Sequence, residues 1–136
     1  MGTFLLDTNI IIDVLNDKRD RSQLLSELTE VHGHILACCP INVAEVYAGM
    51  RSNEEARTNA LLRSLLMYPI TFDIAEFAGT LKRDHAKKGI TLSLTDAIIA
   101  AVAIRNHITL ITDNVKHFAM TGLKLHPLPG RSSRVQ

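Results

Sequence analysis

The stretch Thr3-Phe4-Leu5-Leu6-Asp7-Thr8-Asn9-Ile10-Ile11-Ile12-Asp13 decides how this chain begins to fold. Residues 3–6 form a short apolar run that ends at Asp7, which is typical of a buried strand. A helix is expected to follow from Thr8 to about Leu15, with Asp7 or Thr8 as its N-cap. The stretch therefore predicts a strand that runs directly into a helix, with an acidic side chain at the junction.

Short strands and helices are expected to alternate along the rest of the chain. No hairpin signal separates the apolar runs, so the strands are expected to be parallel and connected by helices, which is an α/β fold. Strands are predicted over 34–39, 108–112 and 123–128, helices over 21–31, 42–49, 53–66, 73–88 and 93–106, and a short helical turn through Phe118.

Composition and charge limit the classes of protein to which the chain can belong. Its 136 residues are expected to form one domain over 1–130, followed by a disordered tail over 131–136. The 15 basic and 14 acidic residues nearly cancel, whereas a protein that only binds nucleic acid usually has a basic excess. A nuclease that uses its acids to bind metal ions can be nearly neutral and still carry a basic rim. Candidates for that rim, for which a solvated face is at least as good an interpretation, are Lys18, Arg19, Arg21, Lys82, Arg83, Lys87, Lys88, Arg131 and Arg134.

The sequence also bears on the location of the protein. It contains no signal peptide and no apolar run long enough to cross a bilayer. Cys38 and Cys39 are adjacent in a predicted strand and point to opposite faces, so they do not indicate a disulfide framework. A cytoplasmic protein with no membrane contact is expected.

Two acidic residues follow directly after predicted strands. Asp7 follows the first strand, and Asp113 follows a strand expected later in the chain. The carboxyl ends of parallel strands lie at one edge of a sheet, where ligands bind in open α/β folds. Glu45, three residues after the expected helix cap Asn42, is placed at the same edge because its helix follows the strand over 34–39.

A further acid, Asp96, lies three residues after Ser93, in the first turn of the helix over 93–106. The segments Ser93–Asp96 and Asn42–Glu45 both resemble capping boxes, in which the acid bonds a free backbone N–H. Capping is the simpler explanation for either acid alone. Several carboxylates at one edge repel one another unless cations lie between them, however, and hard divalent cations prefer oxygen ligands. The coincidence of these acids favours a metal site.

The chain resembles PIN-domain proteins in four motifs and a closing strand, which occur in the order typical of that family. The resemblance spans Phe4 to about Pro129, nearly the whole chain. The segments that carry it are Leu6-Asp7-Thr8-Asn9-Ile10-Ile11-Ile12-Asp13, Val43-Ala44-Glu45-Val46-Tyr47-Ala48-Gly49, Thr95-Asp96-Ala97-Ile98-Ile99-Ala100-Ala101-Val102-Ala103, Ile111-Thr112-Asp113-Asn114-Val115-Lys116-His117-Phe118 and Leu125-His126-Pro127-Leu128.

Within that family, the short single-domain form is similar to the VapC-type toxins of bacterial toxin–antitoxin pairs. The resemblance implies a PIN-like three-layer sandwich, whose central parallel sheet of four to five short strands is flanked by helices. It implies an endoribonuclease that depends on Mg²⁺ or Mn²⁺, forms a homodimer and is silenced by a cognate antitoxin. Asp7, Glu45 and Asp96 match the three main acids of the family, and Thr8 matches its site-facing hydroxyl.

The fourth position of the expected site has two candidates. The family pattern is Thr, any residue, then Asp or Asn, so Thr112 places Asn114 at that position, with Asp113 offset by one. Either side chain could face the metal from a loop. The predicted catalytic and metal-binding residues are Asp7, Glu45, Asp96 and Asp113, supported by Thr8, Asn9, Thr112 and Asn114.

Two other classes of protein are compatible with parts of this pattern. An aspartyl-phosphate phosphatase or receiver-like domain also places an Asp after its first strand. Such enzymes often carry a second Asp two residues later, where this chain has Asn9. A catalytically silent PIN-like module that binds RNA or a protein is the other alternative, and the intact acids Asp7, Glu45 and Asp96 argue against it.

Overall fold

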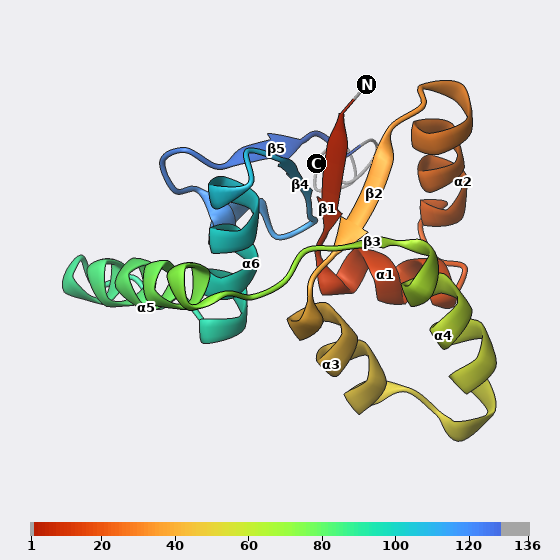
Figure 1. Ribbon diagram of the computed structural model, residues 1–136, viewed down its shortest axis with the longest axis horizontal. Coiled ribbons are helices and arrows are strands. Elements are labelled where there is room, and N and C mark those ends of the chain that lie inside the picture. Colours follow the sequence, from red (N-terminus) through yellow and green to blue (C-terminus); the bar gives the residue numbers. More distant parts are fainter. Residues whose placement is uncertain (1, 129–136) are drawn as a thin grey trace, which may run out of the picture.

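Five parallel strands form a central sheet with the order β3-β2-β1-β4-β5 (Figure 1). In this computed structural model, which describes residues 2–128, the strands are β1 (Thr3–Leu6), β2 (Ile35–Cys38), β3 (Leu66–Met67), β4 (Thr109–Ile111) and β5 (Lys124–His126). β2 and β3 extend the sheet on one side of β1, and β4 and β5 extend it on the other. The strand order therefore reverses at β1, and the carboxyl ends of β1 and β4 flank the point where ligands bind in open α/β sheets.

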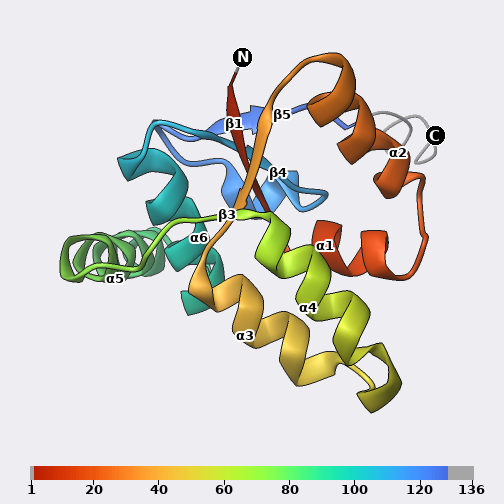
Figure 2. The ribbon, with the colours of Figure 1, turned by 45° about the vertical axis from the view of Figure 1, so that its right-hand side comes forward.

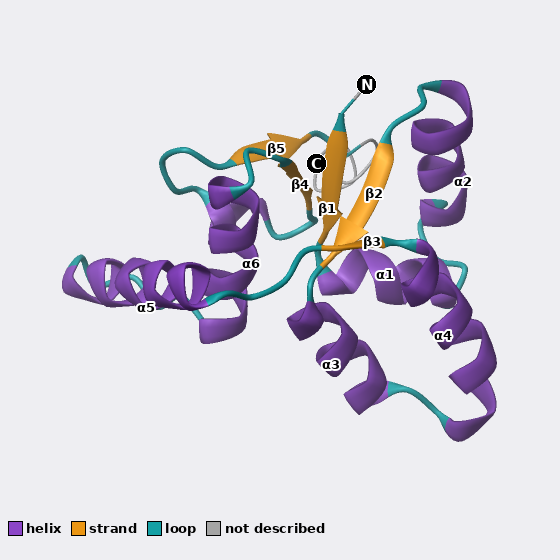
Figure 3. Cartoon of the chain, in the orientation of Figure 1, coloured by secondary structure: helices purple, strands orange, loops and turns teal. Residues whose placement is uncertain are grey.

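Helices cover both faces of this sheet (Figures 1 and 3). One face is covered by α5 and α6, and the other by α1 to α4, and the turned view in Figure 2 keeps the two groups apart. The helices are α1 (Thr8–Leu15), α2 (Arg21–Ser26) with a π-helical turn (Glu27–Val31), α3 (Pro40–Gly49), a 3-10 turn (Ser52–Glu54), α4 (Glu55–Ser64), α5 (Phe72–Lys87), α6 (Leu94–Arg105) and a 3-10 turn (Val115–Phe118). The predicted three-layer α/β sandwich is confirmed.

Adjacent residues of the central strands supply two separate hydrophobic cores. Successive side chains of a strand point to opposite faces, so one residue of each pair faces α5 and α6 and the next faces α1 to α4. The pairs are Leu5 and Leu6 in β1, Ala37 and Cys38 in β2, and Leu110 and Ile111 in β4. Because both faces of these strands are buried, their sequences are continuous apolar runs.

The edge strand β3 was not predicted, because Leu66 was assigned to the preceding helix. That helix, α4, ends at Ser64, and Leu66 and Met67 pair in parallel with β2. The N–H of Tyr68 continues the ladder by donating to the carbonyl of Cys38 at 2.9 Å. A short apolar run fits a helix or a strand equally well, and here pairing with β2 decides the outcome.

The start of α3 also differs from the prediction. Cys39 is the N-cap and Pro40 the first helical residue, so Asn42 is the third residue of the helix and not its cap. Proline is well tolerated at this first position because its missing N–H would have no partner inside the helix. Glu45 consequently lies in the second turn of α3 and not in the first.

Two further predictions from the sequence concern a C-terminal tail and membrane-spanning segments. The predicted tail over 131–136 lies outside the described residues, as does the end of the predicted domain at 129–130. Within residues 2–128, every helix is too short or too polar to span a bilayer.

Candidate active site

Asp7 lies at the carboxyl end of β1, beside the end of β4. Its backbone N–H donates to the carbonyl of Ile111 at 2.9 Å, which ties the two strand ends together. The side chain is almost fully buried, with 4% of the residue exposed. The short run Leu5-Leu6 delivers Asp7 to this point, as the sequence predicts, because the buried strand ends where the acid begins.

Three hydrogen bonds hold the end of β4 and the Asp7 carboxylate in place. One oxygen, Oδ1, accepts the backbone N–H of Thr8 at 2.8 Å and thereby caps α1. The other, Oδ2, accepts the hydroxyl of Thr112 at 2.7 Å. That hydroxyl in turn accepts the backbone N–H of Asn114 at 2.9 Å, so Thr112 connects Asp7 to the loop after β4. Asp7 is therefore both the helix cap and a buried acid.

The pKa of Asp7 is raised by its surroundings. Burial is the largest cause that raises its pKa, and the negative charges of Asp96 on α6 and Glu45 on α3 raise it further. The hydrogen bonds from Thr112 and Thr8 oppose this shift in the pKa. The structure thus brings Asp7, Glu45 and Asp96 close enough to interact.

We predict that Asp7→Asn stabilises the metal-free protein at neutral pH. Since the pKa of Asp7 is raised on folding, the folded state binds more protons than the unfolded state between the ordinary and the raised pKa. The contribution of Asp7 to stability therefore falls as the pH rises through that window, and the carboxylate opposes folding above it. Asparagine removes this buried charge and still caps α1, although it loses the bond from the Thr112 hydroxyl.

The measurement is the melting temperature of both proteins in EDTA at several pH values. The advantage of the variant should be greatest near about pH 7 and should shrink as the pH falls towards about 4. A wild type that gains on the variant as the pH rises would contradict the prediction.

Glu45 and Asp96 are held differently from what simple capping boxes would require. The Thr8 hydroxyl donates to Oε1 of Glu45 at 2.6 Å. Ser93 caps α6 by accepting the N–H of Asp96 at 3.1 Å, but the Asp96 carboxylate lies 3.6 Å from Nδ1 of His117. Both carboxylates therefore contact side chains outside their own helix starts.

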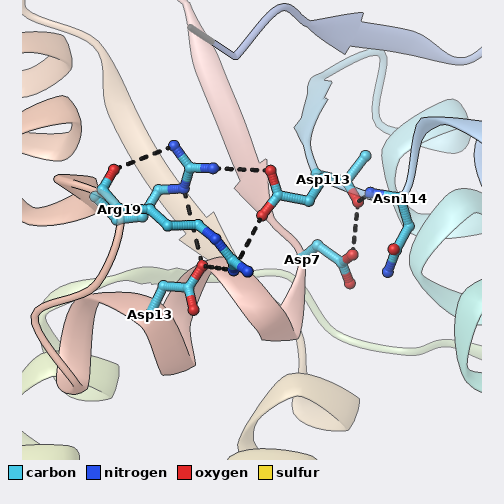
Figure 4. Close-up of polar contacts among 7 residues, drawn as sticks. Asp7, Asp13, Arg19, Asp113 and Asn114 are labelled. Atoms are coloured by element: carbon cyan, nitrogen blue, oxygen red, sulfur yellow. Dashed lines mark hydrogen bonds and ion pairs between the residues drawn. The ribbon is translucent and has the colours of Figure 1, made fainter. Parts of the chain in front are cut away.

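Asp113 and Asn114 point in different directions (Figure 4). The Asp113 carboxylate is 2.8 Å from Nη2 of Arg21 and 3.9 Å from Nη1 of Arg19, whereas the Asn114 side chain lies on the side of Asp7. Arg19 also pairs with Asp13 at 3.0 Å. Asp113 thus belongs to an arginine–aspartate cluster, defined as Asp13, Arg19, Arg21 and Asp113.

This cluster was not anticipated from the sequence. Arg21 was a candidate for an exposed basic rim, but it is 2% exposed, so that assignment is wrong. Asp13, two turns along α1 from the junction, is also buried. Its position on the apolar side of α1 was the available signal, since a charge among buried residues needs a partner. Asn9, a predicted supporting residue, is exposed on α1.

Asp7, Glu45 and Asp96 carry the negative charge that attracts a hard cation, although their side chains are not arranged as a metal-binding group. Among residues 2–128, no Lys or Arg forms an ion pair with Asp7, Glu45 or Asp96. Within the same range, no three acidic, His or Cys side chains form a group that could hold a metal ion. Asp7 is buried, Glu45 and Asp96 are partly buried, and carboxylate oxygens of this kind are the ligands that Mg²⁺ and Mn²⁺ prefer. Asp7, Asp96, Glu45 and the Asn114 amide are the side chains here that could supply oxygen ligands to such an ion.

Comparison with known proteins points to one family. Residues 4–122 match the family model of the PIN domain. Ribonuclease VapC19 from Mycobacterium tuberculosis is 34% identical over 116 residues, which cover 85% of this chain and 92% of that protein. Ribonuclease VapC2 from Haemophilus influenzae is 30% identical over 123 residues, which cover 87% and 91%.

Solved structures with the same fold are similar over nearly their whole length. A toxin–antitoxin complex from Klebsiella pneumoniae matches with a TM-score of 0.73 at 34% identity, over 90% of this chain and 95% of that chain. VapBC2 from Rickettsia felis bound to a DNA fragment from its promoter matches with a TM-score of 0.79, over 91% and 97%. The identity in that second case is 24%, so this likeness concerns the fold.

Proposed function

We propose, from the premise that this chain belongs to the PIN-domain family, that it is a metal-dependent endoribonuclease. The observation that carries the proposal is the group of Asp7, Glu45 and Asp96 near the point where the strand order reverses. The charges of Glu45 and Asp96 raise the pKa of Asp7, and within residues 2–128 no Lys or Arg forms an ion pair with any of the three acids. The names of the VapC ribonucleases that the chain resembles support RNA as the substrate.

In this proposal Asp7 and Asp96 are the residues that would hold Mg²⁺ or Mn²⁺. When bound, the ion supplies an activated water and relieves negative charge on the scissile phosphate. Glu45 would help to hold the ion or would orient the attacking water. Thr112 keeps the Asp7 carboxylate in place through its 2.7 Å hydrogen bond. In-line attack would leave a 5′-phosphate and a 3′-hydroxyl, with no role for the RNA 2′-hydroxyl as a nucleophile.

The fourth ligand in this proposal is Asn114, and Asp113 has a structural role. Asp113 is engaged by Arg21 at 2.8 Å, whereas the Asn114 side chain points away from Arg21 (Figure 4). The backbone N–H of Asn114 is connected to Asp7 through the Thr112 hydroxyl. We predict that Asn114→Ala weakens Mn²⁺ binding by about 10-fold, and that Asp113→Asn lowers stability but changes Mn²⁺ affinity by less than about 2-fold. Titration calorimetry at a temperature where both variants are folded measures this. An equal or greater loss of affinity in Asp113→Asn would place Asp113 in the metal site instead.

The proposed partners follow from the same similarity. The matching chain from Klebsiella pneumoniae belongs to a toxin–antitoxin complex, which supports a toxin role and a cognate antitoxin for this protein. We also propose a homodimer in the cytoplasm, as the family resemblance implies.

The test is RNA cleavage by the purified chain, free of any partner, with Mg²⁺, Mn²⁺ or EDTA. Cleavage in either metal, no cleavage in EDTA and products with 5′-phosphate ends are the expected results. Products with 2′,3′-cyclic phosphate would contradict the mechanism. A well-folded protein that cleaves no RNA would instead favour the silent binding module.

A further inference from the structure

A buried chain of hydrogen bonds connects the start of α3 to Glu45 by way of α1. The backbone N–H of Cys39 donates to Oδ1 of Asn42 at 2.8 Å, and the Cys39 thiol donates to the same oxygen at 3.3 Å. Nδ2 of Asn42 donates to Oγ1 of Thr8 at 3.0 Å, and Thr8 donates to Oε1 of Glu45 at 2.6 Å. We call these four residues, Cys39, Asn42, Thr8 and Glu45, the amide relay.

The backbone N–H of Cys39 determines which group donates and which accepts in the later bonds of the amide relay. A backbone N–H can only donate, so the atom of Asn42 that faces Cys39 must be the carbonyl oxygen. The amide nitrogen of Asn42 therefore faces Thr8 and donates to it. The Thr8 hydroxyl carries one proton, and because it already accepts from Asn42, that proton is directed to Glu45.

The consequence for Glu45 is a defined orientation. Oε1 is held as a hydrogen-bond acceptor, which leaves Oε2 as the oxygen available for a metal or a water. Asn42 is completely buried and Thr8 is 7% exposed, so bulk water is poorly placed to replace either bond. Asn42 and Glu45 also lie three residues apart on α3, which places both on the side of α3 that contacts α1.

We propose that Asn42 is a positioning residue that sets the orientation of Glu45 through the Thr8 hydroxyl, in addition to its bond at the start of α3. This inference rests on the proposed function, because it concerns how Glu45 contributes to the metal site. It differs from a plain capping role, which would stabilise α3 and have no effect that depends on Glu45.

Two charge-neutral variants break the amide relay at different points. Asn42→Ala removes the amide, and Thr8→Val removes the hydroxyl but leaves the bond between Cys39 and Asn42 intact. Each is expected to weaken Mn²⁺ binding about 10-fold, measured by titration calorimetry. Thr8→Ser keeps a hydroxyl and is expected to recover most of the affinity lost in Thr8→Val. If Asn42→Ala does not fold, Thr8→Val and Thr8→Ser decide.

The deciding measurement repeats Asn42→Ala and Thr8→Val in a Glu45→Ala background. Once Glu45 is absent, either change should alter Mn²⁺ affinity by less than about 2-fold, because the relay then has no end point. The control is Asn59→Ala on α4. Asn59 accepts from Tyr47 and Arg63, outside the amide relay, and its loss should leave Mn²⁺ affinity within about 2-fold.

Two results would overturn the inference, and they differ from each other. Losses of Mn²⁺ affinity that are equal with and without Glu45 would show that Asn42 and Thr8 do not act through it, while the proposed metal site would stand. A wild-type protein that does not bind Mn²⁺ would remove the proposed metal site itself, and the role of the amide relay with it.

Discussion

Asp7→Asn is expected to reduce metal-dependent RNA cleavage by about 100-fold or more, since losing even an indirect metal contact typically costs 10- to 100-fold. Asp7 is the most buried of the three acids and the one whose pKa both other acids raise. A neutral amide removes the charge that would attract the cation. Because asparagine also caps helices, α1 should form normally, and the loss should be one of chemistry and not of folding.

The assay compares wild type, Asp7→Asn and Asp96→Asn, purified in the same way, with Mn²⁺ and with EDTA. Asp73→Asn provides a matched control, because Asp73 lies on α5 with a side chain that is 70% exposed and paired with Arg105. That control should cleave at the wild-type rate. Equal cleavage by all four proteins would indicate a contaminating nuclease and would count against the assignment of Asp7.

Arg21→Met is expected to lower the free energy of unfolding by about 3 kcal/mol or more, the usual cost of removing one partner of a buried ion pair. Arg21 is 2% exposed, and its guanidinium lies 2.8 Å from Asp113 and 3.9 Å from Asp13. Without it, two buried carboxylates depend on the half-exposed Arg19. Within the described residues, Nε of Arg21 and Oδ2 of Asp113 have no hydrogen-bond partner. The expected loss of stability is therefore at the lower end of the about 3 to 5 kcal/mol that such a change costs.

The segment that precedes Arg21 has an unusual backbone conformation. The connection between α1 and α2 holds Asp17, Arg19 and Asp20 at φ values of 52° to 55°, a left-handed conformation that non-glycine residues rarely adopt. Arg21 follows directly and anchors this connection to the loop after β4 through Asp113. Arg21→Met should therefore also detach this connection from the loop after β4, which faster amide hydrogen exchange over residues 17–20 would show.

Urea unfolding measures the effect, with Arg63→Met as the control. Arg63 is exposed on α4 and bonds Asn59, so its loss should change stability by about 0.5 kcal/mol. The double variant Arg21→Met/Asp113→Asn should lose less than the sum of its single changes, because it leaves one buried charge fewer unpaired. Equal stability of Arg21→Met and wild type would show that the arginine–aspartate cluster contributes no net stability.

Much of the fold and part of the candidate site follow from local sequence patterns. Apolar runs and helix caps have short-range physical causes, so the strand before Asp7, the cap at Ser93 and the parallel sheet could be derived from neighbouring residues alone. The same patterns predicted that Asp7 and Glu45 lie at one edge of that sheet, and in the structure Thr8 contacts both carboxylates.

Tertiary structure decided the features that depend on distant partners. Leu66 joins β2 as an edge strand because β2 offers free hydrogen-bonding groups there, and no local signal encodes that neighbour. The direction of Asp113 is set by Arg21, which lies 92 positions earlier and reaches it only because β4 packs beside β1. Asn42 meets Thr8 across 34 positions for a similar reason. The sequence by itself thus determined that Asp7 and Glu45 lie near one edge of the sheet, because each is close in sequence to the end of a strand, and only the packed fold determined which partner each polar side chain meets.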